Sequence, residues 1–288
     1  MRTITTFIVI FLLFGIQVPA QIEKGMKEKF AKFEKETKSI LEKENKLKGK
    51  DFVYIPLDIN FARDMRNAFL KYTLPVLDKE GVLRTDTFTL GNQQWRELCD
   101  FLQNNSEVTI IRLYFLQFFQ NDFKSKYTEL APFDGKLYLG IGFFDHSKNL
   151  VSGKYYGMLS VGKTVEIEPQ DFIKMHNNYL DNIRSKINNL STSGENTKYL
   201  KIDVEDFEVQ RKIIEVYNST MSPKNMHSLT FTLAQAIDPV SPTPFYSSKY
   251  IKSQGQLTAL TDAIDNNGNV IDHLKNYDMN SLCPEQCP

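Results

Sequence analysis

Three consecutive stretches rich in β-branched and aromatic residues constrain the fold of this chain most strongly. They are 108-VTIIRLYFLQFF-119, 136-KLYLGIGFFD-145 and 150-LVSGKYYGMLSV-161, and this composition is typical of β-strands. Consecutive strands joined by short loops pair in the antiparallel direction, so we expect an antiparallel sheet. Stretches with helical periodicity at 92–103 and 169–187 flank these strands in the sequence. The predicted fold class is therefore α+β, with helices covering one face of each sheet.

The second part of the chain repeats this order. A helical stretch at 204–218 precedes three strand-like runs, which are 227–237, 256–265 and 269–277. The turns 145-DHSKNLV-151 and 265-DNNGNVI-271 lie 120 residues apart and share Asp and Asn at matching positions. We therefore expect a duplicated helix–strand–strand–strand unit.

The sequence predicts six segments. Residues 188–198 are polar and without periodicity, which predicts a linker. It separates a first α+β unit from a second one, and the remaining segments lie toward the two ends. The predicted boundaries are 1–20 for a signal peptide, 21–50 for a charged amphipathic helix, 51–187 for the first unit, 199–278 for the second unit and 279–288 for a tail that contains cysteines.

The expected helix at 21–50 has an apolar stripe that includes Met26, Phe30, Phe33 and Ile40, with Lys and Glu at most other positions. This spacing is typical of an amphipathic helix. We favour a helix that packs this stripe on the domain behind it. Contact with an anionic membrane surface or with a helical partner is the alternative.

Residues 1–20 have the pattern of a secretory signal peptide. An early Arg2 is followed by an apolar run, and Val18-Pro19-Ala20 places small residues at a cleavage site. The run is shorter than the roughly 20 residues that a membrane span requires. We expect cleavage near Ala20 and a periplasmic or secreted protein without a transmembrane span in the mature chain.

The stretch 157-GMLSVGKT-164 matches the phosphate-binding pattern G-x-x-x-x-G-K-[ST]. Such a loop requires a helix directly after it, because the N–H groups at the helix N-terminus hold the anion. Here 165-VEIE-168 alternates apolar and acidic residues, which predicts a strand. We therefore interpret the match as a chance one, expect a strand, a turn and a second strand, and do not expect an ATPase.

Titratable residues form no recognisable catalytic or metal-binding pattern. The four histidines have no metal-binding spacing. Glu166 and Glu168 are two residues apart on a predicted strand, which favours one solvent-facing side over a catalytic pair. His176 lies on an apolar stripe and Cys99 on the apolar face of its helix, so we expect both to be buried. No catalytic residue, cofactor or metal is expected. The 35 basic and 35 acidic residues balance, so nucleic acid is not an expected partner.

Two long connections rich in aromatic residues are the predicted binding feature. They lie at 117–135 and 238–255, between the first and second long strands of each part. Long loops in compact domains tend to be functional, and exposed rings stack on sugars or anchor protein partners. The alternative is that the rings fold back and seal the core. The candidate ligand-binding residues are Phe119, Phe123, Tyr127, Phe245, Tyr246 and Tyr250.

The chain ends in 277-YDMNSLCPEQCP-288. Outside the cytoplasm two nearby thiols usually oxidise, so a disulfide between Cys283 and Cys287 is favoured. Free thiols, an intermolecular bridge, or a metal site near His273 are the alternatives. This tail, the Asp-x-x-x-Asn turn and the run 112-RLYF-115 resemble a group of uncharacterised exported bacterial proteins. The resemblance covers about the last 80 residues directly, and it implies no activity.

The sequence thus predicts a non-catalytic extracytoplasmic binding protein whose ligand is a glycan or a protein. Two alternatives stay open. One is a secreted or periplasmic hydrolase that acts on a surface polymer, and the other is an envelope-associated structural protein that assembles through its N-terminal helix.

Overall fold

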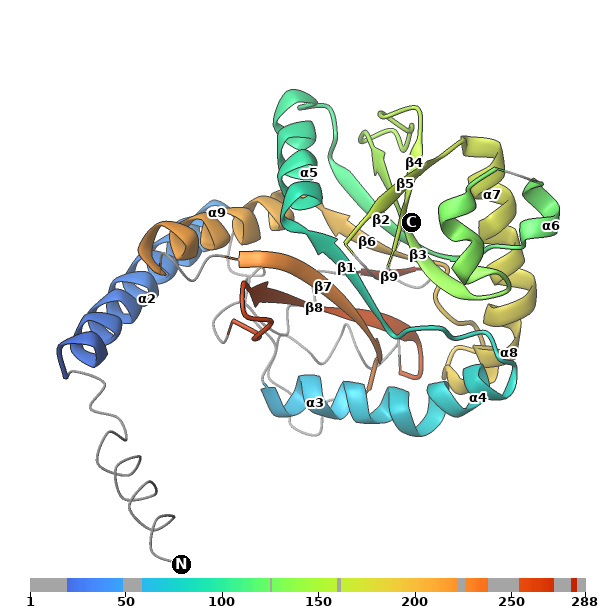
Figure 1. Ribbon diagram of the computed structural model, residues 1–288, viewed down its shortest axis with the longest axis horizontal. Helices are drawn as coiled ribbons and strands as arrows, with labels where there is room; N and C mark the ends of the chain where they lie inside the picture. The colour runs from blue at the N-terminus through green and yellow to red at the C-terminus, as the bar shows by residue number, and fades with distance from the viewer. Residues whose placement is uncertain are drawn as a thin grey trace, which may run out of the picture.

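The computed structural model describes residues 20–48, 59–124, 126–159, 162–221, 226–237, 254–271 and 281–283. They form two antiparallel sheets with helices around them (Figure 1), which confirms the predicted α+β class. The smaller sheet has the strand order β1-β7-β8 and the larger one the order β5-β4-β3-β2-β6-β9. The strands are β1 (Thr87–Gly91), β2 (Ile110–Gln117), β3 (Leu137–Phe144), β4 (Tyr155–Met158), β5 (Thr164–Ile167), β6 (Tyr199–Asp203), β7 (Met226–Gln235), β8 (Leu257–Asp265) and β9 (Ser281–Cys283).

Helices precede, separate and flank these strands. None of the described helices is both long enough and apolar enough to cross a membrane. The α-helices are α2 (Ala20–Lys48), α3 (Ile59–Ala68), α4 (Leu74–Lys79), α5 (Asn92–Asn104), α6 (Gln120–Phe123), α7 (Pro169–Asn178), α8 (Ser185–Ile187) and α9 (Val204–Met221). Two π-helices, η1 (Phe69–Thr73) and η3 (Tyr179–Arg184), and two 3₁₀-helices, η2 (Thr128–Phe133) and η4 (Asn188–Leu190), complete the set.

Strands from the two predicted units are interleaved in both sheets. Strand β1 pairs with β7, which places Thr87 opposite Thr232, and β6 pairs with β2, which places Tyr199 opposite Tyr114. The boundary at 188–198 therefore does not separate two sheets. The expected helix–strand–strand–strand order also omits β1 and β6, each of which comes directly before a helix. The duplication itself stays a prediction.

Part of the stretch 188–198, which its composition predicts to be a linker, is packed into the core. Asn196 and Thr197 are completely buried. The Asn196 side-chain amide donates to the carbonyl of Ile187 at 3.0 Å, and its oxygen accepts from the backbone N–H of Leu257 at 2.8 Å. The Thr197 hydroxyl donates to the Leu257 carbonyl at 2.6 Å. Asn196 and Thr197 thus bond the start of β8, while residues 192–195 are exposed.

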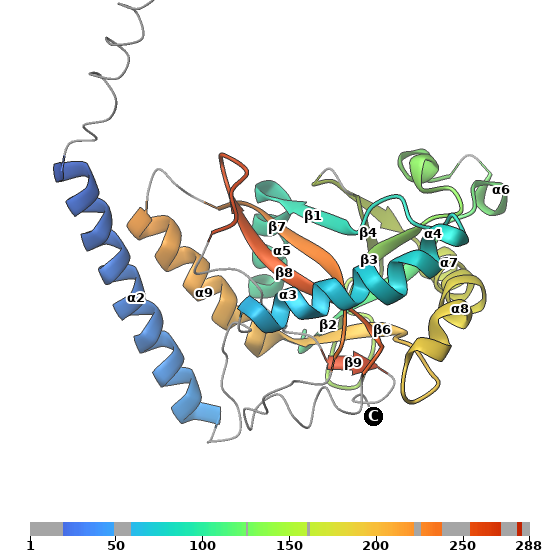
Figure 2. The ribbon, with the colours of Figure 1, turned by 90° about the horizontal axis from the view of Figure 1, so that it is seen from below.

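Helix α2 confirms the predicted long N-terminal helix, and it lies alongside α9 in both ribbon views (Figures 1 and 2). Phe33 of its apolar stripe is 1% exposed and packs edge-on against Tyr217 of α9, with ring centroids 5.4 Å apart. Met26, Phe30 and Ile40 are partly buried against the same core. The stripe is therefore used within the chain.

The helical stretch that begins with α3 passes through Pro75 and ends at Lys79. The π-helix η1 carries the chain from α3 into α4, and Pro75 occupies the first turn of α4. This proline directly follows the π-turn, in which the N–H of Leu74 donates to the carbonyl of Phe69. Residues 49–58, which precede α3, lie outside the described residues.

Candidate functional site

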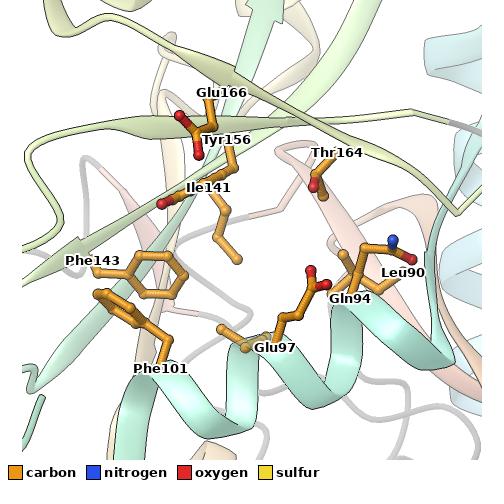
Figure 3. Close-up of a pocket in the computed structure, with 10 residues that line it drawn as sticks. Leu90, Gln94, Glu97, Phe101, Ile141, Phe143, Tyr156, Thr164 and Glu166 are labelled. Carbon is orange, nitrogen blue, oxygen red and sulfur yellow. The ribbon is translucent and has the colours of Figure 1, made fainter. Parts of the chain in front are cut away.

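A pocket of about 270 Å³ lies between helix α5 and one face of strands β3, β4 and β5 (Figure 3). It opens where the two sheets meet. There, a Cβ atom added to Gly91, at the end of β1, would lie 3.2 Å from the carbonyl oxygen of Gly162. The two sheets therefore come close together beside Leu90 and Thr164, which line the pocket. The lining residues are Leu90, Gln94, Glu97, Leu98, Phe101, Ile141, Phe143, Tyr156, Thr164 and Glu166.

Strand register places the five lining residues of the larger sheet on one face. Ile141 of β3 is opposite Tyr156 of β4, and Tyr156 is opposite Glu166 of β5. Paired residues in an antiparallel sheet project to the same side, and residues two apart in a strand do so as well. Phe143 and Thr164 therefore join this face. The result is an apolar surface that becomes polar toward β5, the edge strand.

Helix α5 supplies the opposite wall. Trp95, Leu98, Cys99 and Leu102 are buried, as the sequence predicts. A second side of the helix faces the pocket and carries Glu97 and Phe101, which are four residues apart and so lie one above the other. The Phe101 ring packs on Phe143 with centroids 4.7 Å apart and an interplanar angle of 43°. These two rings form the apolar end of the pocket.

The rim of the pocket is acidic. Glu97 is exposed and accepts a hydrogen bond from the side-chain amide of Gln93 at 2.8 Å. Glu166 pairs with the ammonium of Lys154 at 2.5 Å, and its side chain is 58% exposed. Burial raises the pKa of Tyr156, and the neighbouring Glu166 carboxylate adds to this effect while Lys154 opposes it. Tyr156 is therefore a neutral hydrogen-bonding group at neutral pH.

The phosphate-loop match lies partly in this region and has the predicted strand–turn–strand structure. Gly157 is within β4, Thr164 begins β5, and Met158 is paired with Thr164. The next helix, α7, begins only at Pro169. The N–H groups of a helix N-terminus, which a phosphate loop requires, do not follow Thr164.

The aromatic loops are not assembled into one site by the described residues. Phe123 is 5% exposed and stacks on Phe118 at 5.5 Å, so it seals the core and is not available to a ligand. Tyr127 is partly buried, and its hydroxyl donates to Asp171 at 2.6 Å. Phe119 is partly exposed. The candidates of the second loop, Phe245, Tyr246 and Tyr250, lie outside the described residues.

His176 is a bonded histidine at the edge of the core, close to the expectation. Burial lowers its pKa, and its Nδ1–H donates to the carbonyl of Phe115 at 3.0 Å. Cys99 is 9% exposed, and burial raises the pKa of its thiol to about 12. Such a thiol is not a reactive nucleophile. In the described parts of the chain, no three His, Cys, Asp or Glu side chains are grouped so that they could hold a metal ion.

The C-terminal cysteines remain predictions. The backbone of Cys283 is in β9 opposite Tyr199, and Cys287 lies outside the described residues.

A second, more polar cavity of about 480 Å³ lies between α5 and α9. Its central cation, Arg211, is already committed to two carboxylates of its own helix: Glu208, with a bond of 2.6 Å, and Glu215. Arg211 is therefore not a free cation for a ligand of this cavity.

Sequence reasoning missed the pocket, although one signal pointed to it. Phe101 falls outside the apolar stripe of α5 that ends at Leu102, so a large ring sits on the side of the helix expected to face solvent. An aromatic residue there requires a second apolar surface. Glu166 is exposed, as expected, but it lies on the pocket rim, and Glu168 caps α7 outside the strand. Comparisons with protein-family models, with curated proteins and with solved structures gave no match for this chain.

Proposed function

We propose that this chain is an exported, non-catalytic binding protein that takes one apolar-bodied group of its ligand into the pocket between α5 and strands β3–β5. Export rests on the signal-peptide pattern of residues 1–20, of which 1–19 lie outside the described residues. The pocket is the observation that carries the binding role.

The composition of the pocket supports binding. Six of its ten lining side chains are apolar or aromatic, and the polar ones lie toward the rim: Gln94, Glu97, Thr164 and Glu166. Ligand sites typically combine apolar walls with a few polar groups that set orientation. Figure 3 shows this division, with Phe101 and Phe143 together at one end and the carboxylates of Glu97 and Glu166 on the helix and the strand that face each other.

A hydrolase is the second candidate, because two carboxylates line one pocket as in glycosidases. The contact between Glu166 and Lys154 at 2.5 Å favours the binding role, since it ties one carboxylate to a counter-ion. Assembly through the N-terminal helix has less support, because the apolar stripe of α2 already packs against α9.

A thermal-shift screen against cell-wall fragments, soluble glycans and short peptides tests the proposal. A ligand at about 100 times its dissociation constant adds roughly 2.7 kcal/mol to the free energy of unfolding. We expect this gain to disappear in Thr164→Trp, which places an indole in the pocket. Lys163→Trp, one residue away on the exposed turn, is the matched control and should keep the gain.

Two outcomes would contradict the proposal. One is a ligand that stabilises Thr164→Trp and the unmodified protein equally, because the ligand would then bind elsewhere. The other is turnover of a polymer that Glu97→Gln or Glu166→Gln abolishes, which would favour the hydrolase.

A further inference from the structure

We infer that the group bound in the α5 pocket is a basic side chain of a protein partner, with an ammonium or guanidinium group on an alkyl stem. This inference rests on the proposed binding function and names the chemistry of the ligand. Three properties of the pocket carry it: its aromatic end, the sign of its charge and its size.

The aromatic end of the pocket favours a cation over an anion. Phe143 is the central ring, with the Phe101 centroid 4.7 Å away and the Tyr156 centroid 6.0 Å away at an interplanar angle of 60°. The faces of aromatic rings carry partial negative charge and attract cations within about 6 Å. Three rings from α5, β3 and β4 thus border one space, and Figure 3 shows no basic side chain among those drawn there.

The charged residues that line the pocket are all acidic. None of the ten lining residues is Lys, Arg or His, whereas Glu97 and Glu166 are both acidic. Within the described chain Glu97 has no ion pair, and its hydrogen bond comes from the neutral amide of Gln93. An anionic ligand would be repelled from this pocket, and a cation would find both a counter-charge and ring faces.

Lys154 indicates which ligand Glu166 accepts. Its ammonium approaches Glu166 to 2.5 Å from outside the pocket, and 44% of its side chain stays exposed. The chain itself therefore places a lysine at this rim. A second cation that enters from solvent reaches Glu97, the carboxylate without such a partner.

The size of the pocket selects one side chain. Sites for drug-sized ligands span about 300–1,000 Å³, and this pocket has about 270 Å³. Leu90, Leu98 and Ile141 line its interior and offer an alkyl stem apolar contact. Long basic side chains bury their methylene groups along such surfaces and keep the charged group near polar partners.

A pair of tripeptides tests this inference: acetyl-Ala-Lys-Ala-amide and the same peptide acetylated on the lysine Nζ. The two share the stem and differ in charge. Binding is followed through chemical-shift changes of the amides of α5 and β5 in the full chain, up to about 10 mM peptide, a range that suits weak single-group contacts. We expect the charged peptide to bind at least about fivefold more tightly, as charge and ring contacts at a partly exposed site suggest.

Glu97→Gln should reduce this preference about threefold at low salt, and the reduction should fade at high salt because the charges are exposed. Glu107→Gln, which removes an exposed charge outside the pocket, is the control and should leave the preference unchanged. Both substitutions are at exposed positions, so folding should be retained.

Equal binding of the two peptides in the pocket would overturn the inference and leave the proposed binding function standing. Absence of any shift at α5 and β5 with either peptide would also overturn it. The ligand screen with Thr164→Trp then decides separately whether the pocket binds a neutral ligand.

Discussion

Helices α5 and α9 have similar positions in the order of elements, yet corresponding sides of the two helices differ in exposure. Each helix begins directly after a short strand, α5 after β1 and α9 after β6. Counted from those strands, Trp95 corresponds to Phe207, and these two rings touch with centroids 5.0 Å apart. The side of α5 that carries Glu97 and Phe101 borders the pocket. The matching side of α9 is buried, and α2 packs along it through Phe33 and Tyr217.

The difference in exposure between α5 and α9 indicates where a binding site can form in this fold. The positions of α9 that match Glu97 and Phe101 are Val209 and Ile213, which are 1% and 0% exposed. Where α2 is present, the side of the helix is apolar and forms core. Where no further helix covers it, the same side carries a carboxylate and a ring that line a pocket.

Other correspondences between the two regions are close in geometry. Asp145 accepts the backbone N–H of Asn149 at 2.8 Å, and Asp265 accepts that of Asn269 at 2.9 Å. Both long helices that flank the sheets contain a π-helix, η1 in one and η3 in the other. Each π-turn reaches a strand glutamine: Thr73 donates to Gln235 at 2.7 Å, and Asn182 donates to Gln117 at 3.1 Å.

The largest difference between the regions should come from a pair of glycines after the long loops. Gly135 donates to Phe118 and Gly255 to Ala236, both with positive φ. An added Cβ would be 3.9 Å from the nearest atom at Gly135 but 1.8 Å from the carbonyl oxygen of Leu190 at Gly255. Gly135→Ala should cost about 1–2 kcal/mol, and Gly255→Ala more than about 4 kcal/mol. Urea unfolding measures both, and equal losses would contradict this asymmetry.

The stability of α9 should depend on its packing against α2. Phe33→Ala should lower the free energy of unfolding by about 3–5 kcal/mol, because a fully buried ring is removed from the α2–α9 contact. Phe101→Ala, on the open side of α5, should cost only about 1–2 kcal/mol, because its ring is partly exposed. Denaturant titration of both variants checks the order. A Phe33→Ala loss below that of Phe101→Ala would show that α2 does not stabilise α9.

Substitutions at Val209 of α9 and at the corresponding Glu97 of α5 test the difference between the two helices residue by residue. Val209→Ala should cost about 2 kcal/mol from lost burial and the cavity that remains. Glu97→Ala at the exposed counterpart should stay within about 0.5 kcal/mol. Calorimetric melting of both variants measures the difference. If Glu97→Ala destabilises as much as Val209→Ala, the α5 side is part of the core and not a site.

The smallest expected difference between the two regions is in how their stability depends on pH. His176 and Arg66 take equivalent roles: His176 donates to the carbonyl of Phe115 at 3.0 Å and Arg66 to that of Leu233 at 2.6 Å. Burial lowers the pKa of His176, and Lys198 and Arg184 act in the same direction against the hydrogen bond to Phe115.

The unfolded chain therefore binds a proton at His176 before the folded protein does, and stability is lost as the pH falls through about 6.5. Between about pH 7.5 and pH 5.5, we expect His176→Gln to lose less free energy of unfolding than the unmodified protein. Urea titrations at the two pH values measure this, and identical pH dependence in both proteins would contradict it.

Periodicity in the sequence predicted the long elements well. The helix at 92–103 and the strand runs around β2 and β3 are close to their observed bounds, because each has many apolar residues in a clear period. Strands β1 and β6 were missed because each has five residues and only alternating partial burial. Their identity depends on partners far away in the chain, which local composition does not encode.

The candidate site was less predictable for the same reason. Glu97 and Phe101 belong to α5, and Tyr156 and Glu166 belong to β4 and β5, so only the tertiary arrangement brings them together. The loop around Phe123 was predicted to bind a ligand because many aromatic residues lie close together in its sequence. The burial of Phe123 shows that density of rings also serves to seal a core.

The interleaving of strands has a consequence for the order in which the chain can fold. Thr87 of β1 and its partner Thr232 are separated by 145 positions along the chain. A growing or newly delivered polypeptide therefore holds β1 with unpaired edges until β7 arrives, which gives a high contact order and slow folding. Unpaired edges invite association with other chains during that interval. The time spent waiting for β7, more than the stability of the finished protein, should set how much of it reaches the native state.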